Sequence, residues 1–195
     1  MKTKPQTAAE FMAELNANSE YQAMLAKQDE KRLKVVAKLK LASKPLDNAL
    51  NAVCPFTIDN VWDLVNTRKR YDEALPVLFE HITKDYPDEI LDGIARALAV
   101  PEALLYRPTL IKLFKQSPPV SSGFRYGLGI AIAHTTGPAN LGETIELAKD
   151  KSLGDSRLAL LLAIKHSHKP EAKQAIEELR EDPDLAKEIA SWKRK

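Results

Sequence analysis

The stretch Gly93-Ile94-Ala95-Arg96-Ala97-Leu98-Ala99-Val100 combines small and aliphatic residues in a pattern that recurs twice later in the chain. The later copies read Gly-Leu-Gly-Ile-Ala-Ile-Ala-His over residues 127–134 and Ala-Leu-Leu-Leu-Ala-Ile-Lys-His over residues 159–166. The three copies begin 34 and then 32 residues apart. Self-similarity with a period of this length is the sequence signature of a stacked repeat.

A second series of apolar residues keeps the same period. Phe79, Leu113, Leu147 and Leu179 follow one another at intervals of 34, 34 and 32 residues. Because this series alternates with the first, each period is predicted to hold a hairpin made of a first helix and a second helix. The last second helix, near residues 185–192, is more polar, as a solvent-facing terminal repeat should be. A more degenerate hairpin is predicted over residues 45–66.

Two of the predicted second helices open with an arginine after a turn. The residues involved are Leu153-Gly154-Asp155-Ser156-Arg157 and Gly123-Phe124-Arg125, whereas the first full repeat has Leu91 at that place. This pattern resembles the HEAT-repeat class of α-solenoids over residues 71–195 and, more weakly, over residues 45–66. The resemblance implies an all-α protein, an α-solenoid of about four to five HEAT-like hairpins. It also implies that second helices line a concave groove, here within residues 88–168.

The N-terminal region is predicted to be a separate helical arm, so the expected domains are an arm over residues 1–44 and a solenoid over residues 45–195. Ser19 is a suitable N-cap for a long helix that runs from Glu20 to about Leu41, and Lys44-Pro45 is expected to end it. The basic residues that follow Glu30 have no acidic neighbour up to Lys44. A solvated helix face explains them more simply than an arm that follows nucleic-acid phosphates.

Composition excludes several classes of protein. The net charge of +2 does not by itself indicate a nucleic-acid partner. Cys54 is the only cysteine, so an internal disulfide and a paired-cysteine metal site are both impossible. The longest apolar run, residues 158–164, is too short to cross a bilayer, and no apolar signal core follows Lys4. We therefore expect a reduced, cytoplasmic protein without a membrane partner or a cofactor.

Three arginines are candidates for contact with a partner. Arg125 and Arg157 are equivalent in the repeat, and Arg96 lies in the preceding second helix. On a concave face they would grip carboxylates or phosphates. The alternative, which we favour, is that such an arginine ties neighbouring turns together through an acid such as Asp155. Tyr126 belongs to the same candidate surface, as does Asp92, whose position near a helix start is also explained by the helix dipole.

Histidines form the other candidate cluster. His134 and His166 occupy the same repeat position, and His168 follows closely, so stacking could bring them together at a metal. Interaction of each histidine with a helix C-terminus is the simpler explanation, so we expect no metal. His134 and His166 therefore stay in the set of partner-binding candidates. Trp62 is expected to be a core residue beside the arm.

No motif of a phosphate-binding loop, nucleophile elbow or zinc protease is present. The favoured hypothesis is a non-catalytic scaffold that binds a protein partner in its groove. A nucleic-acid-binding solenoid, using the basic arm and groove arginines, is the alternative. A solenoid enzyme acting on DNA bases, as some HEAT-like glycosylases do, would need aromatics facing a basic groove, whereas Trp62 and Trp192 are far apart in the sequence. The oligomeric state stays open.

Overall fold

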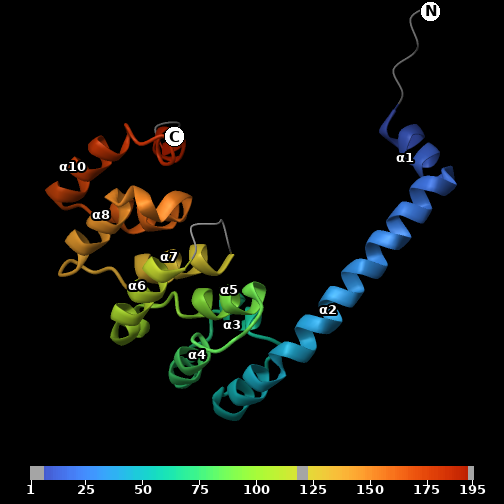
Figure 1. Ribbon diagram of the computed structural model, residues 1–195, viewed down its shortest axis with the longest axis horizontal. Helices are drawn as coiled ribbons and strands as arrows, with labels where there is room; N and C mark the ends of the chain where they lie inside the picture. The colour runs from blue at the N-terminus through green and yellow to red at the C-terminus, as the bar shows by residue number, and fades with distance from the viewer. Residues whose placement is uncertain (1–6, 118–122, 193–195) are drawn as a thin grey trace, which may run out of the picture. The chain divides into compact units, whose positions relative to one another are not determined.

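The computed structural model describes residues 7–117 and 123–192, and these contain helices but no strand (Figure 1). The expectation of an all-α protein is confirmed for these residues. The chain divides into two compact units, Met1–Ala42 and Ser43–Lys195, two residues from the boundary expected between arm and repeats. Most of the turn expected at Ser117-Pro118-Pro119 lies outside the described residues.

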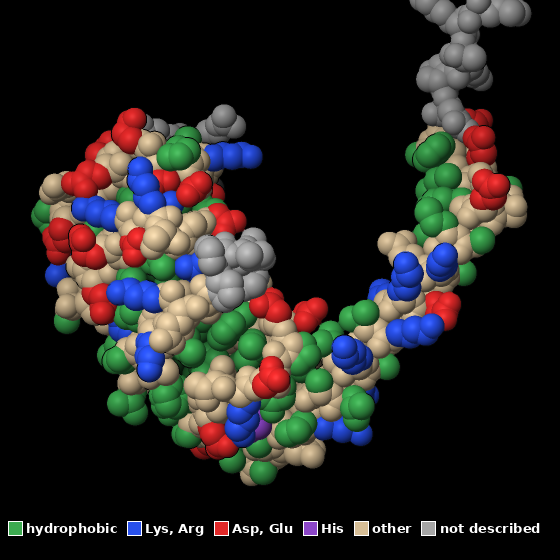
Figure 2. Space-filling model, viewed as in Figure 1, with side chains coloured by type: hydrophobic (Ala, Val, Ile, Leu, Met, Phe, Trp, Pro, Cys, Tyr) green, Lys and Arg blue, Asp and Glu red, His purple; other side chains and the backbone are tan. Residues whose placement is uncertain are grey.

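Unit 1 holds α1 (Ala8–Ala17) and about the first two thirds of α2 (Ser19–Val53). Thr7 and Glu10 form a capping box, in which the Thr7 hydroxyl accepts from the Glu10 backbone N–H and the Glu10 carboxylate accepts from the Thr7 backbone N–H. None of the described residues of unit 1 is buried. Figure 2 shows apolar side chains near α1 and Lys and Arg side chains along the middle of α2.

The prediction that Lys44-Pro45 ends the long helix is wrong, because α2 continues through Pro45 to Val53. A proline inside a helix removes one backbone hydrogen bond and crowds the preceding turn. Leu46 and Leu50 follow it and are both fully buried, so packing of this last part of α2 outweighs the local cost. The predicted N-cap Ser19 is instead the first helical residue, and the Asn18 side chain accepts from the Tyr21 backbone N–H.

Unit 2 consists of short helices. They are α3 (Trp62–Asn66), α4 (Leu75–His81), α5 (Asp88–Ala97), α6 (Arg107–Gln116), α7 (Gly123–His134), α8 (Leu141–Lys149), α9 (Leu161–His166), α10 (Pro170–Leu179) and α11 (Ala186–Ser191). The 3₁₀ segments η1 (Asp72–Ala74), η2 (Pro101–Tyr106) and η3 (Lys151–Leu160) precede α4, α6 and α9. The predicted first helices are α4, α6, α8 and α10, and the predicted second helices are α5, α7, η3 with α9, and α11.

Each first helix packs on its own second helix, and second helices pack on one another in chain order. Thus α3 contacts α5, α5 contacts α7, and α7 contacts both η3 and α9. The contact between α5 and α7 is the most extensive in the chain's described part. The core between these helices contains Ile94, Leu98 and Leu128, which are fully buried. The recurring small-plus-aliphatic stretch therefore supplies buried core residues in α5, in α7 and in the segment formed by η3 and α9.

Glycines allow the second helices to approach closely. A Cβ atom at Gly93 would lie 2.6 Å from a Val61 methyl carbon, and one at Gly127 would lie 3.1 Å from the Ala95 Cβ atom. At Gly129 an added Cβ atom would lie 2.8 Å from the Ala159 Cβ atom and 3.2 Å from a backbone oxygen. Successive helix contacts thus each depend on a position that has no side chain.

Replacing Gly129 by alanine should destabilise unit 2 by about 1–3 kcal/mol, because the new methyl group meets a Cβ atom and backbone that cannot rotate away. Gly142 is the matched control, since nothing lies within 4 Å of a Cβ atom there and it too is helical. Gly142→Ala should stabilise the protein by about 0.5–1 kcal/mol. Urea unfolding followed by circular dichroism measures both changes. Equal stability of the two variants would contradict the close packing.

Candidate functional site

Arg157 is a buried structural residue rather than a surface residue, with none of its side chain exposed to solvent. Its guanidinium donates to both carboxylate oxygens of Asp182 at 2.8 and 3.2 Å, and to Asp184 at 2.8 Å. It also donates to the backbone oxygens of Ala148 and Gly154. The sequence suggested Asp155 as the acid that pairs with Arg157. The pairing acids come instead from the turn before α11.

Arg125 is also buried, with 1% of its surface exposed. Its Nε–H donates to the Phe114 backbone oxygen at 3.2 Å, and its guanidinium carbon lies 5.5 Å from the centre of the Phe114 ring. Because both side chains are buried, neither Arg125 nor Arg157 presents its guanidinium at the surface of unit 2. The prediction of a row of groove arginines is wrong at these two positions, and the favoured alternative of a structural role accounts for them.

Arg96 lies at the surface between two aromatic rings. Its guanidinium carbon is 5.9 Å from the centre of the Trp62 ring and 5.6 Å from that of the Tyr126 ring. Asp92 holds it through a 2.7 Å bond to Nε–H, one helical turn earlier on α5. We call Trp62, Asp92, Arg96 and Tyr126 the aromatic clamp. It joins α3, α5 and α7, and it brings together three of the sequence-derived candidates.

The expectation that Trp62 belongs to the core is wrong, because 36% of its surface is exposed. Its indole lies against α5 at Gly93, where an added Cβ atom would be 3.1 Å from the indole nitrogen. Tyr126 is similarly exposed, at 39%. The short α3 places Trp62 beside the second helices, which no pattern in residues 57–66 indicated.

Asp88 and Asp92 both belong to α5 and both lie against α7. The Asp88 carboxylate accepts from the backbone N–H of Gly123 at 2.9 Å, and so stabilises the start of α7 rather than its own helix. Asp92 lies under α7, where a Cβ atom at Gly127 would be 2.6 Å from its carboxylate oxygen. The acidic residues near the start of α5 thus help to join α5 to α7.

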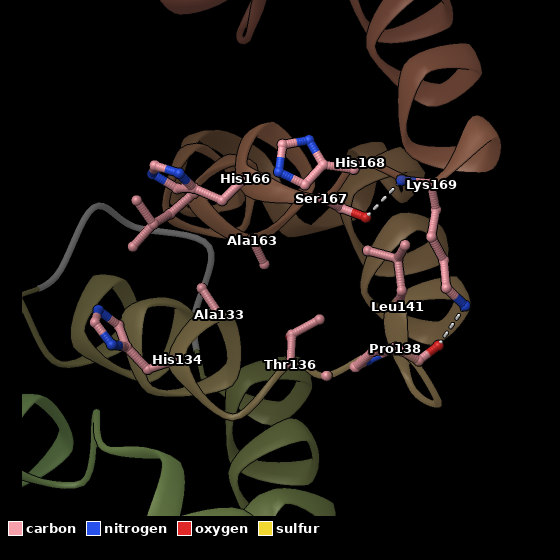
Figure 3. Close-up of a pocket in the computed structure, with 12 residues that line it drawn as sticks. Ala133, His134, Thr136, Pro138, Leu141, Ala163, His166, Ser167, His168 and Lys169 are labelled. Carbon is pink, nitrogen blue, oxygen red and sulfur yellow. Dashed lines mark hydrogen bonds between the residues drawn. The ribbon is translucent and has the colours of Figure 1, made fainter.

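His134 and His166 line one pocket, which has a volume of about 590 Å³ and lies between α7, α8 and α9 (Figure 3). We call it the histidine pocket. Its lining residues are Ala133, His134, Thr136, Gly137, Pro138, Leu141, Leu162, Ala163, His166, Ser167, His168 and Lys169. The methyl groups of Ala133 and Ala163 point toward each other across it, and Lys169 reaches across the other end to the Pro138 backbone oxygen at 2.9 Å.

The three imidazole rings of the pocket do not converge on a common point (Figure 3). Within the described residues, no group of three or more histidine, cysteine or acidic side chains is arranged to hold a metal ion. Partial burial lowers the pKa of His134 below its ordinary value, which favours a neutral ring at pH 7. The pocket is thus an apolar cavity whose rim carries three imidazoles and one ammonium group.

The charges of first and second helices differ near this pocket. Exposed glutamates cover α8 and α10, among them Glu143, Glu146, Glu171 and Glu177 (Figure 2). By contrast, none of the residues that line the histidine pocket is acidic. The pocket rim thus carries no negative side chain, in contrast to the exposed surface of α8 and α10.

Sequence reasoning missed Arg107, Leu162 and Lys169. Arg107 is 3% exposed and donates to the Ile132 backbone oxygen at 2.7 Å and the Thr144 hydroxyl at 2.8 Å. Its position at the start of a first helix, after a 3₁₀ segment, carries no repeat signal. Leu162 belongs to the apolar run 158–164, and 40% of it is exposed at the pocket.

No family model matches the sequence, and no curated protein or solved structure matches the chain significantly. In the part of the chain that the structure describes, we find no helix with the combined length and apolar character needed to cross a membrane.

Replacing Arg157 by alanine should destabilise the protein by about 3–5 kcal/mol, because the buried carboxylate of Asp182 loses its partner. The matched control is Arg70→Ala, which removes an exposed ion pair to Asp72 and should change stability little. Urea unfolding at pH 7 measures both. An Arg157→Ala variant as stable as the wild type would contradict the structural role.

The same pair sets an acid dependence. Hydrogen bonds from Arg157 lower the pKa of Asp182, so its contribution to stability is complete above its unfolded pKa of about 3.9 and is lost as pH falls through the lower folded value. The stability difference between wild type and Arg157→Ala should therefore narrow as pH falls from neutral, because protonation of Asp182 first removes the unpaired buried charge of the variant and then, below about pH 4, the ion pair of the wild type. A difference that does not depend on pH would contradict this assignment.

Proposed function

We propose that the protein is a short HEAT-like solenoid that binds an extended segment of a protein partner, without catalysis, on the surface formed by α3, α5, α7 and α9. The observation that carries the proposal is the aromatic clamp, in which the half-buried Arg96 is fixed between an exposed tryptophan and an exposed tyrosine, the three residues coming from α5, α3 and α7. Tryptophan, tyrosine and arginine are the residues that most often dominate the energy of a protein interface.

The clamp is ordered before a partner arrives. Asp92 fixes the Arg96 side chain at Nε, and two rings restrict it from either side. Long side chains normally lose rotamer freedom when an interface forms, which costs binding free energy. A pre-ordered Arg96 avoids much of this cost, so the clamp is suited to be an anchor point.

A single helix joins the clamp to the histidine pocket. Tyr126, Ile130 and His134 lie at intervals of four residues on α7, and none of the three is buried. Eight helical residues span about 12 Å, roughly the length of four residues of extended peptide. A segment laid along α7 therefore reaches both the clamp and the pocket.

The chemistry of the pocket indicates what this segment carries. The apolar floor at Ala133, Leu141 and Ala163 accepts an aliphatic side chain. The rim residues His166 and Lys169 offer donors to a neighbouring carboxylate, and Glu171, which pairs with Lys169 at 3.5 Å, is not among the residues that line the pocket. The proposed partner segment thus combines an aliphatic anchor with an acidic residue.

A library of random peptides displayed on phage provides the test. Peptides selected on the wild type should bind Trp62→Ala and Tyr126→Ala at least about tenfold more weakly, because each variant removes a hot-spot ring. Leu105→Ala is the matched control, since Leu105 is 80% exposed but lies on η2, and it should bind with unchanged affinity. Circular dichroism verifies that the variants are folded.

Selection of no peptide, or equal affinity for the clamp variants and the wild type, would contradict the proposal. Oligonucleotide binding that falls steeply with salt, and that is lost in Lys34→Ala/Lys38→Ala, would favour the nucleic-acid alternative instead.

A further inference from the structure

Unit 1 exposes an unusual number of large apolar side chains. Among the residues that the structure describes, thirteen large hydrophobic residues are exposed, and seven of them lie in unit 1, namely Phe11, Met12, Met24, Leu33, Val35, Val36 and Leu41. None of the described residues 7–42 is buried. Most of the stability of a helix in a protein comes from packing, which α2 obtains through Leu46 and Leu50, whereas these exposed apolar side chains of unit 1 are not covered.

The charges of unit 1 are segregated along its length. Residues 7–30 contain five acids and one lysine, whereas residues 31–42 contain five basic residues and no acid. All five acids are exposed, and so are all five basic residues. The net charges of the two segments are −4 and +5. The arm thus has a longer acidic segment and a shorter basic segment whose charges are nearly equal in size and opposite in sign.

We infer that the arms of two copies of this chain pair with each other in antiparallel orientation. In this arrangement the basic segment 31–42 of one arm faces residues 19–30 of the other, which carry Glu20, Asp29 and Glu30, on both sides of the centre of the pair. A parallel arrangement places like charges together, which is unfavourable. The inference concerns unit 1 alone and does not depend on the proposed function of unit 2.

The centre of the arm fits the same arrangement. The sign of charge changes between Glu30 and Lys31, so an antiparallel pair centred there sets Asp29 and Glu30 opposite Lys31 and Arg32 of the second copy. Within one arm, Asp29 already pairs with Arg32 and Glu30 with Lys34, and these contacts are solvent-exposed. Polar residues at the centre thus set the register, while apolar residues on both sides are covered.

Sedimentation of the full chain over a micromolar concentration series tests the pairing. The wild type should be a dimer, and Lys31→Glu/Lys34→Glu/Lys38→Glu should weaken the dimer at least about tenfold, because both segments of the arm become acidic. Glu20→Lys/Asp29→Lys/Glu30→Lys should weaken it as well, and an equimolar mixture of the two variants should restore a dimer.

The matched control reverses three exposed lysines outside the arm, as Lys112→Glu/Lys173→Glu/Lys187→Glu, and should remain a dimer. A monomeric wild type, as expected if the arm packs on its own chain, would overturn the inference. A dimer that the arm variants leave unchanged would overturn it too.

Disulfide cross-linking determines the orientation. With Cys54→Ser as the background, Ala23→Cys and Ala37→Cys lie at nearly equal distances from the centre, on opposite sides. Oxidation of their mixture should cross-link one variant to the other, and neither variant should cross-link efficiently alone. Efficient cross-linking of each variant to itself would show a parallel pair and contradict the inference.

Discussion

The close approach of successive second helices is the constraint on which the rest of unit 2 depends. Gly93, Gly127 and Gly129 each lie where a Cβ atom would meet the neighbouring helix, at distances shorter than van der Waals contact. This spacing sets Trp62, Arg96 and Tyr126 side by side, although they belong to three helices. The surface proposed for binding is therefore a consequence of how the core is packed.

Buried arginines supply a second set of links. Arg107 joins α6 to the end of α7 and to α8, Arg125 joins α7 to the end of α6, and Arg157 joins η3 to the turn before α11. The guanidinium groups of Arg107 and Arg157 are hydrogen-bonded to backbone oxygens, hydroxyls and carboxylates, as burial of a charge requires, and Arg125 donates its Nε–H to the Phe114 backbone oxygen. These contacts fix the ends of helices, while the glycines fix the distance between them.

The period of the sequence was sufficient to predict an all-helical chain, because small and aliphatic residues repeat in α5, in α7 and in the segment formed by η3 and α9, where they enter the core. It did not predict which side of each helix faces solvent. Arg157 shares its repeat position with Arg125, but the sequence does not show that both are buried. Their burial depends on the turn that supplies Asp182 and on the backbone that surrounds each guanidinium. Trp62 was misplaced because its exposure depends on the position of α3 against Gly93, a contact between residues far apart in the sequence.

Pro45 shows a limit of a different kind. A local rule predicts a helix end there, but tertiary burial of Leu46 and Leu50 overrides it. The histidine pocket, in turn, was anticipated only in that His134 and His166 share a repeat position. Its apolar floor and its lysine come from three helices and the segment after α9, which no single stretch of sequence reveals.

Hydrogen exchange of the full chain, read by mass spectrometry, tests most directly whether the second helices form one packed unit. The account predicts that the amides of α5 and α7 exchange most slowly and at a common rate, because the two helices open only together. It predicts fast exchange for α1, which has no buried residue. Exchange of α5 and α7 at clearly different rates, or at rates similar to that of α1, would contradict the account.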